Sequence, residues 1–286
     1  MKIGITSYSL HAALKDGRIA PLDAITWAAR HGAECFEISP GEFFPMTGDA
    51  PEQYVARCRE EGVVLSGYTV GANFVQADDA ARAAEVRRLK GEVDLAVRLG
   101  VTRMRFDAGW RKPAEATLEN FEKDLPLVAG CCAQVADYAN TFGIVTSVEN
   151  HGFHFQGAER IQRLVRAVDR PYYRTTLDVG NFSCADEDNL ASVKMNLPLA
   201  SFIHLKDFFI RPAGNPPVGP GWFTSRAGNY LRGTIVGHGS LDMRNICRAI
   251  RESGYDGFVS VEFEGSEDCF FGTETGIRNA NELLRG

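Results

Sequence analysis

Short apolar runs alternate with longer amphipathic stretches along this chain. The runs are rich in β-branched and aromatic residues, and they predict eight strands, at residues 2–6, 35–39, 63–70, 102–108, 143–150, 173–180, 201–207 and 257–264. Most of them are separated by stretches with helical spacing, the clearest at residues 21–32, 76–100, 114–142 and 157–169. The helix at 76–100 has an apolar stripe that ends at Gly100, a residue suited to a helix C-terminus.

This alternation predicts an α/β fold with a parallel sheet, in one domain that spans residues 1–286. A core of about 250 residues favours a closed (β/α)8 TIM barrel over an open doubly wound sheet. One connection, residues 207–240, breaks the rhythm because it is rich in glycine and proline and has no helical period. Since it leaves the carboxyl end of a strand, where barrel active sites lie, we expect it to cover the active site.

Composition and charge limit the cellular compartments and the classes of partner that we expect for this protein. The net charge of −6 leaves no basic excess for a phosphate backbone, so nucleic acid is not expected as a partner. The seven cysteines have neither disulfide-framework nor zinc-ribbon spacing, which favours a reduced, cytoplasmic compartment. No apolar run reaches the length of a signal peptide or a membrane span, so we expect neither export nor a membrane partner. A homo-oligomer is compatible with the sequence.

Strand parity places four ionisable side chains at one end of the predicted barrel. Alternate residues of a strand face opposite ways, and the large apolar residues mark the outward parity. On the last four predicted strands the inward parity falls on Glu149, Asp178, His204 and Glu262. Neighbouring strands lie about 4.8 Å apart, so these four groups can converge on one centre. Three carboxylates at that spacing need a compensating cation, and we therefore predict one bound divalent metal ion.

The type of ligand narrows the choice of metal. An oxygen-rich set with a single imidazole favours Mn²⁺, with Mg²⁺, Co²⁺ or Zn²⁺ as alternatives, and it differs from the thiolate-rich set of structural zinc sites.

Five segments then carry a resemblance to a known family. SVENHG, TTLDVGNF, FIHLKDF, GHGSLD and VSVEFEG follow one another in this order along the chain. They resemble the sugar phosphate isomerase/epimerase superfamily, the xylose-isomerase-like barrels. The resemblance implies that one metal ion is held by Glu149, Asp178, His204 and Glu262, the same set that parity selects. It also implies that Glu149 and Glu262 are the catalytic acid and base, the role of the two metal-binding glutamates in ketose epimerases.

Two positions depart from the ketose 3-epimerases of that superfamily. Phe155 stands where those enzymes tend to have a second substrate-binding Glu, and Asn181 stands where they place a His. The sugar-binding pattern of that subfamily is therefore not reproduced. The long connection 207–240 resembles more closely the inosose-processing and lyase-like branches, in which proton abstraction beside a ketone is followed by loss of a β-substituent.

These observations predict a metal-dependent isomerase or epimerase that acts on a keto sugar or a related polyol ketone, a small-molecule substrate. The alternative is a lyase or dehydratase that uses the same residues for β-elimination on a 3-keto sugar, an inosose or a keto-glycoside. Two other hypotheses are an abasic-site endonuclease and a sugar-binding barrel without catalysis. The endonuclease is disfavoured because that relative needs three zinc ions and many more ligands, whereas this chain has six histidines and an acidic pI near 5.6.

Six further residues are candidate substrate contacts because they face inward or lie just beyond a strand: Glu37, Arg105, His151, Asn181, Lys206 and His238. Structural alternatives exist for several of them. His151 could orient a metal ligand, and Lys206 could pair with a carboxylate. Glu37 and Arg105 could belong to a buried ion-pair set. For His238 the alternative is a capping turn, because Ser240 has the character of a helix N-cap.

Other residues near these motifs are expected to stay outside the metal site. Asp207 has outward parity, and Glu264 lies about 6.6 Å further along its strand than Glu262. His154 is expected to be part of the loop structure. Three aromatic residues on loops after strands could supply an apolar wall for a sugar ring or could be simple packing residues: Phe74, Trp110 and Trp222.

Overall fold

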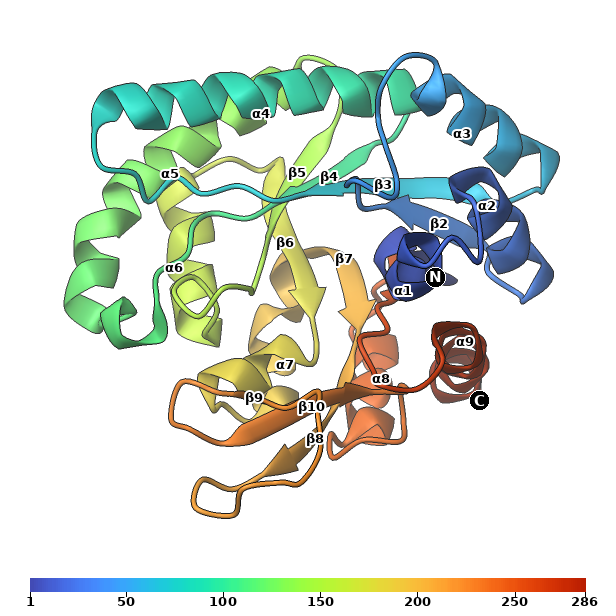
Figure 1. The fold of residues 1–286 in the computed structure, drawn as a ribbon. Coiled ribbons are helices and arrows are strands. Elements are labelled where there is room, and N and C mark those ends of the chain that lie inside the picture. The colour runs from blue at the N-terminus through green and yellow to red at the C-terminus, as the bar shows by residue number, and fades with distance from the viewer.

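The apolar runs form strands at the predicted places, and the strands close into a barrel (Figure 1). This is a computed structural model that describes residues 1–286. The barrel strands are β1 (Lys2–Thr6), β2 (Cys35–Ile38), β3 (Val64–Val70), β4 (Arg103–Phe106), β5 (Val145–Glu149), β6 (Tyr173–Asp178), β7 (Ala200–Leu205) and β11 (Phe258–Val261). They pair in the order β1-β11-β7-β6-β5-β4-β3-β2 and all pairs are parallel, so the predicted (β/α)8 barrel is confirmed.

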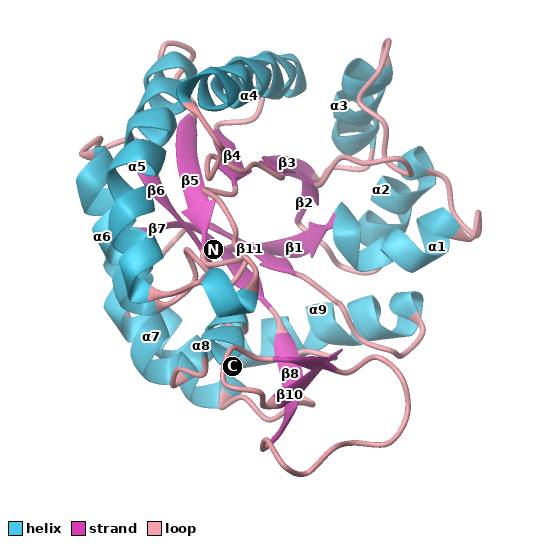
Figure 2. Ribbon diagram, turned by 60° about the vertical axis from the view of Figure 1, so that its left-hand side comes forward, coloured by secondary structure: helices cyan, strands magenta, loops and turns pink.

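Helices surround the ring of strands, as Figure 2 shows. They are α1 (His11–Lys15), α2 (Pro21–Arg30), α3 (Ala50–Glu60), α4 (Asp79–Leu99), α5 (Leu118–Asn140), α6 (Ala158–Val168), α7 (Asn189–Asn196), α8 (Met243–Glu252) and α9 (Cys269–Arg285), with short 3-10 turns η1 (Ser7–Leu10), η2 (Pro113–Glu115), η3 (Asn181–Ala185) and η4 (Leu197–Leu199). The outward strand residues Ile203 and Val259 are fully buried in one apolar core with α8 residues such as Ile250. None of the helices has the length and apolar content that crossing a membrane requires.

The ends of α4 illustrate how local chemistry sets the boundaries. The Asp78 side chain accepts a hydrogen bond from the backbone N–H of Ala81, which satisfies a donor that the first turn leaves free. Gly100 ends the helix with φ of 66°, in the left-handed region that glycine adopts without steric cost. The four predicted helices therefore appear within a few residues of their expected limits.

Helix α9 carries glycines on part of the face that packs against the barrel. A Cβ added at Gly276 would lie 2.9 Å from Val261 Cγ1, so the helix approaches β11 too closely for a larger residue. These glycines are explained by the close packing of the helix on a strand.

The long connection 207–240 contains regular structure that its sequence did not reveal. It folds into β8 (Asp207–Arg211), β9 (Phe223–Thr224) and β10 (Tyr230–Thr234), an antiparallel sheet in the order β8-β10-β9 outside the barrel. In Figure 1 this sheet lies beside β7 and α8. Its first two strands are separated by residues 212–222, whose glycines and prolines dominate the composition of the connection.

Asp207 ties this sheet to the barrel. Its fully buried carboxylate accepts hydrogen bonds from the backbone N–H groups of Phe208 (2.8 Å), Gly237 and Gly239 (3.0 Å each) and Leu241 (3.3 Å). The expectation that Ser240 caps the next helix is wrong, because the Ser240 hydroxyl accepts from the Ile210 N–H. The cap of α8 is Asp242, whose side chain can reach the N–H of Asn245 since it lies two residues closer to the helix than Ser240.

Replacing Asp207 by Ala should destabilise the protein. The change leaves buried backbone N–H groups without an acceptor, and each such group costs about 1–3 kcal/mol. We expect the free energy of unfolding in urea to fall by about 3 kcal/mol. Asp242→Ala is the control, since loss of an exposed helix cap costs only about 1 kcal/mol. Equal losses in the two variants would contradict the role given to Asp207.

Candidate metal centre

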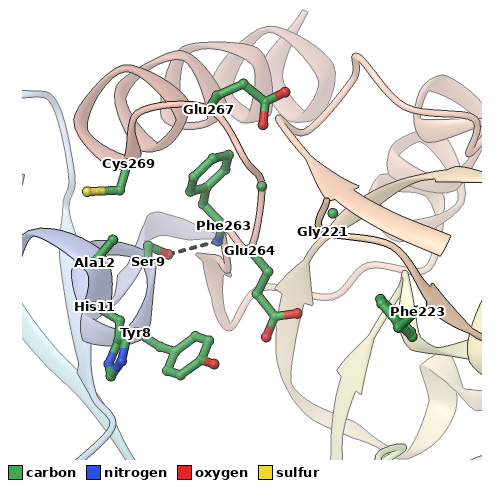
Figure 3. A pocket seen from close by; sticks show the side chains of 12 residues that line it. Tyr8, Ser9, His11, Ala12, Gly221, Phe223, Phe263, Glu264, Glu267 and Cys269 are labelled. Atoms are coloured by element: carbon green, nitrogen blue, oxygen red, sulfur yellow. Dashed lines mark hydrogen bonds between the residues drawn. The ribbon is translucent and has the colours of Figure 1, made fainter. Parts of the chain in front are cut away.

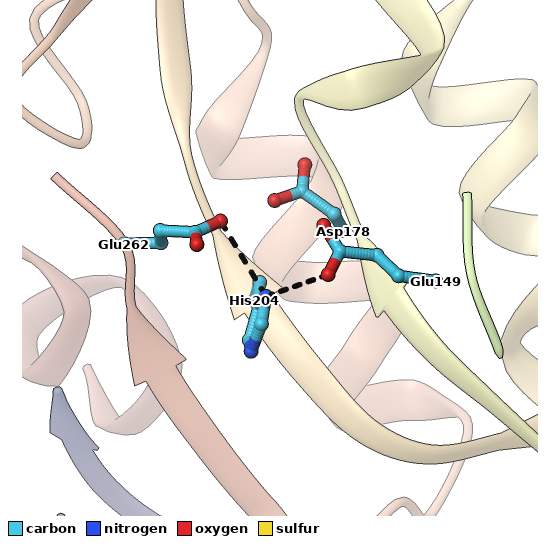
Figure 4. A group of neighbouring side chains, drawn as sticks. All are labelled: Glu149, Asp178, His204 and Glu262. Carbon is cyan, nitrogen blue, oxygen red and sulfur yellow. Dashed lines mark ion pairs between the residues drawn. The ribbon is translucent and has the colours of Figure 1, made fainter. Parts of the chain in front are cut away.

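Four side chains from the carboxyl ends of neighbouring strands gather at the mouth of the barrel (Figure 4). Glu149 ends β5, Asp178 ends β6, His204 lies near the end of β7, and Glu262 directly follows β11. Asp178 and His204 are register partners, so the pairing of β6 with β7 sets them side by side. One potential ligand atom of each residue lies within 4.8 Å of the others. The structure thus brings together the four residues that strand parity selected.

The donor atoms of this cluster fit a divalent cation. Asp178 Oδ2 and His204 Nδ1 are buried and have no hydrogen-bond partner within the protein. Buried polar atoms are rarely left unpaired, so two such atoms in one group indicate a missing partner. His204 Nδ1 lies 3.6 Å from Glu149 Oε2 and 3.5 Å from Glu262 Oε2, too far for good hydrogen bonds. Three carboxylates and one imidazole are a donor set that suits Mn²⁺, Mg²⁺ or Co²⁺.

Glu37 holds the imidazole of His204 from behind. His204 Nε2 lies 2.9 Å and 3.1 Å from the two carboxylate oxygens of Glu37, and Thr69 donates a hydrogen bond to the same carboxylate. A hydrogen bond from Nε2–H leaves Nδ1 as the free acceptor that faces the cluster. Glu37, a candidate substrate contact from the sequence, is therefore buried behind a metal-ligand candidate.

Asn181 and Arg105, two further candidate substrate contacts, hold Glu149. The Asn181 amide donates to Glu149 Oε1 at 2.9 Å, and Arg105 Nη2 lies 2.8 Å from Glu149 Oε2. The turn after β6 also fixes Asp178, because its Oδ1 accepts the backbone N–H groups of Gly180 and Asn181 at 2.7 Å each. A Cβ at Gly180 would lie 2.8 Å from the Lys206 carbonyl oxygen, so only glycine fits this turn. Each carboxylate is thereby oriented by its neighbours.

Charge is unevenly distributed in the cluster. Burial alone would raise the pKa of Glu149, but Arg105 and His204 outweigh it and lower that pKa to about 2. Burial, and then the charges of Glu149 and Glu262, raise the pKa of Asp178 to about 7 against the opposing charge of Lys206. The cluster therefore tends to retain a proton near neutral pH when no cation neutralises it. Binding of a divalent cation would displace that proton.

Lys206 links the cluster to a neighbouring carboxylate. Its ammonium is almost fully buried and lies 2.8 Å from Glu262 Oε2, 3.3 Å from Glu264 Oε1 and 3.6 Å from Asp178 Oδ2. Burial would lower the pKa of Lys206, but Glu262, Glu264 and Asp178 raise it well above its usual value. Lys206 is therefore a permanent positive charge beside the cluster. Its pairing with a carboxylate, the predicted alternative to a substrate contact, is present.

The three histidines that lie near the sequence motifs, apart from His204, have different environments. His151 is 52% exposed, and its Nδ1 lies 3.2 Å from Asp107, which in turn pairs with Arg105 at 2.8 Å. His154 is buried and lies 2.7 Å from Asp124, as expected of a structural residue. His238 is exposed on the loop after β10, and no hydrogen bond or ion pair joins its side chain to the cluster. Of the candidate substrate histidines, the structure thus brings only His151 into contact with the groups around Glu149.

Phe155 stands where ketose 3-epimerases tend to have a substrate-binding Glu, and it does not offer the substrate another contact. Its side chain is 1% exposed and packs against the rings of Phe121 and His154. The position belongs to the apolar core under the loop.

A pocket of about 350 Å³ lies beside the Glu262 end of the cluster (Figure 3). Tyr8 and His11, which follow β1, line one side, and Phe223 of the three-stranded sheet lines another. The Tyr8 ring and the Glu264 carboxylate point into the same space. Sequence reasoning missed Tyr8 and His11 as site residues. The sequence feature that could have identified them as site residues is their position just beyond the carboxyl end of β1.

Comparison with known proteins places this fold and site in a family. A family model described as "Xylose isomerase-like TIM barrel" matches residues 25–286. The chain belongs to this family. Among curated relatives, an inosose dehydratase of Lacticaseibacillus casei is 29% identical over 132 residues, which are 46% of this chain and 44% of that protein. This chain therefore matches less than half the length of that relative.

Solved structures with the xylose isomerase-like barrel resemble this one over their full length. The probable 3-DHS dehydratase AsbF from Bacillus anthracis has a TM-score of 0.76 at 15% identity, with 100% of both chains covered. A D-psicose 3-epimerase studied in the presence of D-fructose has a TM-score of 0.73 at 16% identity, also with 100% of both chains covered. At these identities the likeness shows the common fold.

Removing one carboxylate of the cluster should abolish stoichiometric metal binding. Asp178→Asn takes away a charged ligand with a free oxygen, and we expect the Kd for Mn²⁺ to rise by more than about 100-fold, beyond the 10–100-fold cost of changing an outer partner. Calorimetric titration of chelator-treated protein measures the Kd. Glu264→Gln, which changes a carboxylate outside the group of four, should keep the wild-type stoichiometry. Unaltered metal content in Asp178→Asn would overturn the ligand assignment.

Proposed function

We propose that this protein is a divalent-metal-dependent isomerase or epimerase of a keto sugar or a related polyol ketone. The observation that supports the proposal most directly is the group Glu149, Asp178, His204 and Glu262, whose unpaired buried atoms gather at the barrel mouth. Its donor set suits Mn²⁺ best, with Mg²⁺, Co²⁺ or Zn²⁺ as alternatives. A bound ion would polarise the substrate carbonyl and stabilise the negative charge that develops on its oxygen.

Glu262 is the better placed of the two glutamates to accept a proton from substrate. Its side chain is 12% exposed, whereas that of Glu149 is 2% exposed. In the proposed reaction Glu262 removes the proton from the carbon beside the carbonyl, and the C–H electron pair becomes the double bond of an enediolate. A proton from water then reaches the opposite face of that carbon by way of Glu149, and Glu262 releases its proton to solvent, which gives the epimer without change of mass.

The neighbouring residues support this division of roles. Lys206 holds Glu262 from one side, and Arg105 and Asn181 hold Glu149 from the other. The Tyr8 hydroxyl and the Glu264 carboxylate offer hydrogen-bonding groups for sugar hydroxyls in the pocket beside Glu262. Phe223 brings the connection 207–240 to the same pocket, consistent with its proposed role as a cover.

A lyase or dehydratase is the second candidate, and the unequal setting of the two glutamates favours it. Both oxygens of Glu149 are engaged, by Asn181 and Arg105, so this residue is better suited to binding a metal than to moving a proton. β-Elimination needs only one base, Glu262, which can pass the proton that it takes from carbon to the leaving oxygen, while the adjacent Lys206 ammonium offsets the negative charge. The resemblance to the inosose dehydratase supports the same alternative.

Proton exchange in D2O tests the half-reaction that both candidates share. With Mn²⁺ and a suitable keto sugar, we expect deuterium to enter at the carbon beside the carbonyl, as measured by NMR. Glu262→Gln should slow this exchange by about 10²-fold or more, the usual contribution of a general base. Glu252→Gln on α8, an exposed acid away from the barrel mouth, should exchange at the wild-type rate. Exchange that survives in Glu262→Gln would refute the assignment of the base.

The products of the same incubation separate the two candidates. An epimerase or isomerase gives a sugar of unchanged composition that contains deuterium, and this is the expected result. Loss of water or of an aglycone would assign the chain to the lyases. Absence of exchange with ketoses, 3-keto sugars and inososes alike would count against both and favour a sugar-binding barrel.

A further inference from the structure

A second pocket lies across the barrel mouth from the one that Tyr8 and Glu264 line. It has a volume of about 360 Å³ and lies between residues 109–113, which follow β4, and residues 151–153, which follow β5. In the closed order β1-β11-β7-β6-β5-β4-β3-β2, the pair β4 and β5 stands opposite the pair β1 and β11. The four candidate metal ligands come from strands β5, β6, β7 and β11, which connect the two sides.

The two pockets differ in chemistry. The first offers a phenol hydroxyl and two carboxylates, from Tyr8, Glu264 and Glu267. The second is walled by Trp110, Pro113 and Phe153. Trp110 is 55% exposed, which is unusual for so large an apolar side chain beside a cavity. An exposed aromatic wall next to a polar site is a typical place for the flat, apolar part of a ligand.

The wall at residues 152–153 is a shaped turn. Gly152 has φ of 80°, and a Cβ there would lie 3.1 Å from Trp110 Cβ, so the turn packs directly on the tryptophan. Phe153 adopts φ of 64°, a left-handed conformation that costs energy for a residue with a side chain. Its N–H donates to Gln156 Oε1 at 2.6 Å, and the Gln156 amide donates to the Asn181 carbonyl at 2.8 Å. The strained wall is thereby tied to the residue that holds Glu149.

The inner end of this pocket reaches the metal centre through charged groups. Asp107 and His151 line the pocket and contact each other. Asp107 also pairs with Arg105, which pairs with Glu149. A group seated against Trp110 therefore lies next to the Glu149 side of the cluster, and the remainder of the molecule can extend toward Glu262.

We propose that this second pocket binds an aromatic aglycone, and that the substrate is an aryl glycoside of a keto sugar rather than a free monosaccharide. The inference rests on the proposed function, since it takes a keto-sugar ring at the metal centre as given. The flat ring stacks on Trp110 and is bordered by Phe153, while the sugar lies over the cluster with its far hydroxyls toward Tyr8 and Glu264. Lys112, a lining residue without an ion pair, adds a cation that attracts an electron-rich phenolic ring.

Binding of unreactive glycosides tests this pocket apart from catalysis. The Mn²⁺-loaded protein is titrated by calorimetry with 4-methoxyphenyl β-glucoside and with methyl β-glucoside, neither of which carries a keto group. We expect the aryl glycoside to bind at least about tenfold more tightly. Trp110→Ala should remove that preference, and Trp110→Phe should restore most of it. Since Trp110 is exposed, neither change should affect folding. Phe142→Ala, an exposed aromatic that precedes β5 at the opposite end of the barrel, is the matched control and should keep the preference.

Equal affinity for the two glucosides, no binding of either, or a preference that persists in Trp110→Ala would overturn the proposal. These outcomes are distinct from failure of the proposed function, which appears as absence of metal-dependent deuterium exchange. An aryl preference that depends on Trp110 in a protein without exchange would support the pocket and reject the chemistry.

Discussion

The repulsion among three carboxylates around one imidazole is the constraint on which the mouth of this barrel depends. Glu149, Asp178 and Glu262 lie within a few ångströms of His204 in a region almost closed to water, where like charges interact strongly. Arg105 and Lys206 offset part of this charge from opposite sides. Asp178 Oδ2 and His204 Nδ1 nevertheless remain without a hydrogen-bond partner, and a divalent cation would both pair with them and relieve the repulsion. Most neighbouring polar residues serve to hold this group in place.

The supporting residues also make the two glutamates different. Glu149 is fixed through both oxygens, while Glu262 has a single ammonium contact and more access to solvent. A symmetrical pair would suit proton transfer on both faces of a carbon, and an unsymmetrical pair also suits elimination with one base. The same asymmetry continues outward, since a polar pocket adjoins Glu262 and an apolar one approaches Glu149. The shape of the mouth thus bears on the choice of reaction and of substrate together.

Several parts of the fold and site were beyond sequence reasoning because they depend on tertiary packing. The strands of residues 207–240 pair only with one another, so the alternation of barrel strands and helices does not predict them. Gly276 of α9 has no local explanation in the sequence, since only its close approach to Val261 excludes a side chain there. Glu37 faces inward as parity predicted, but its bond to His204, 167 positions away in the sequence, turns a candidate substrate contact into support for a ligand.

The sequence by itself determined the barrel and the four residues at its centre. The alternation of side chains along a strand is a local property, so inward parity can be assigned to Glu149, Asp178, His204 and Glu262 without knowledge of contacts. Only the tertiary structure decided which residues hold these four and what space surrounds them. Tyr8 meets Glu264, and Trp110 meets Gly152, because closure of the barrel brings distant loops to one end. Such contacts follow from packing among separate segments, which no local pattern records.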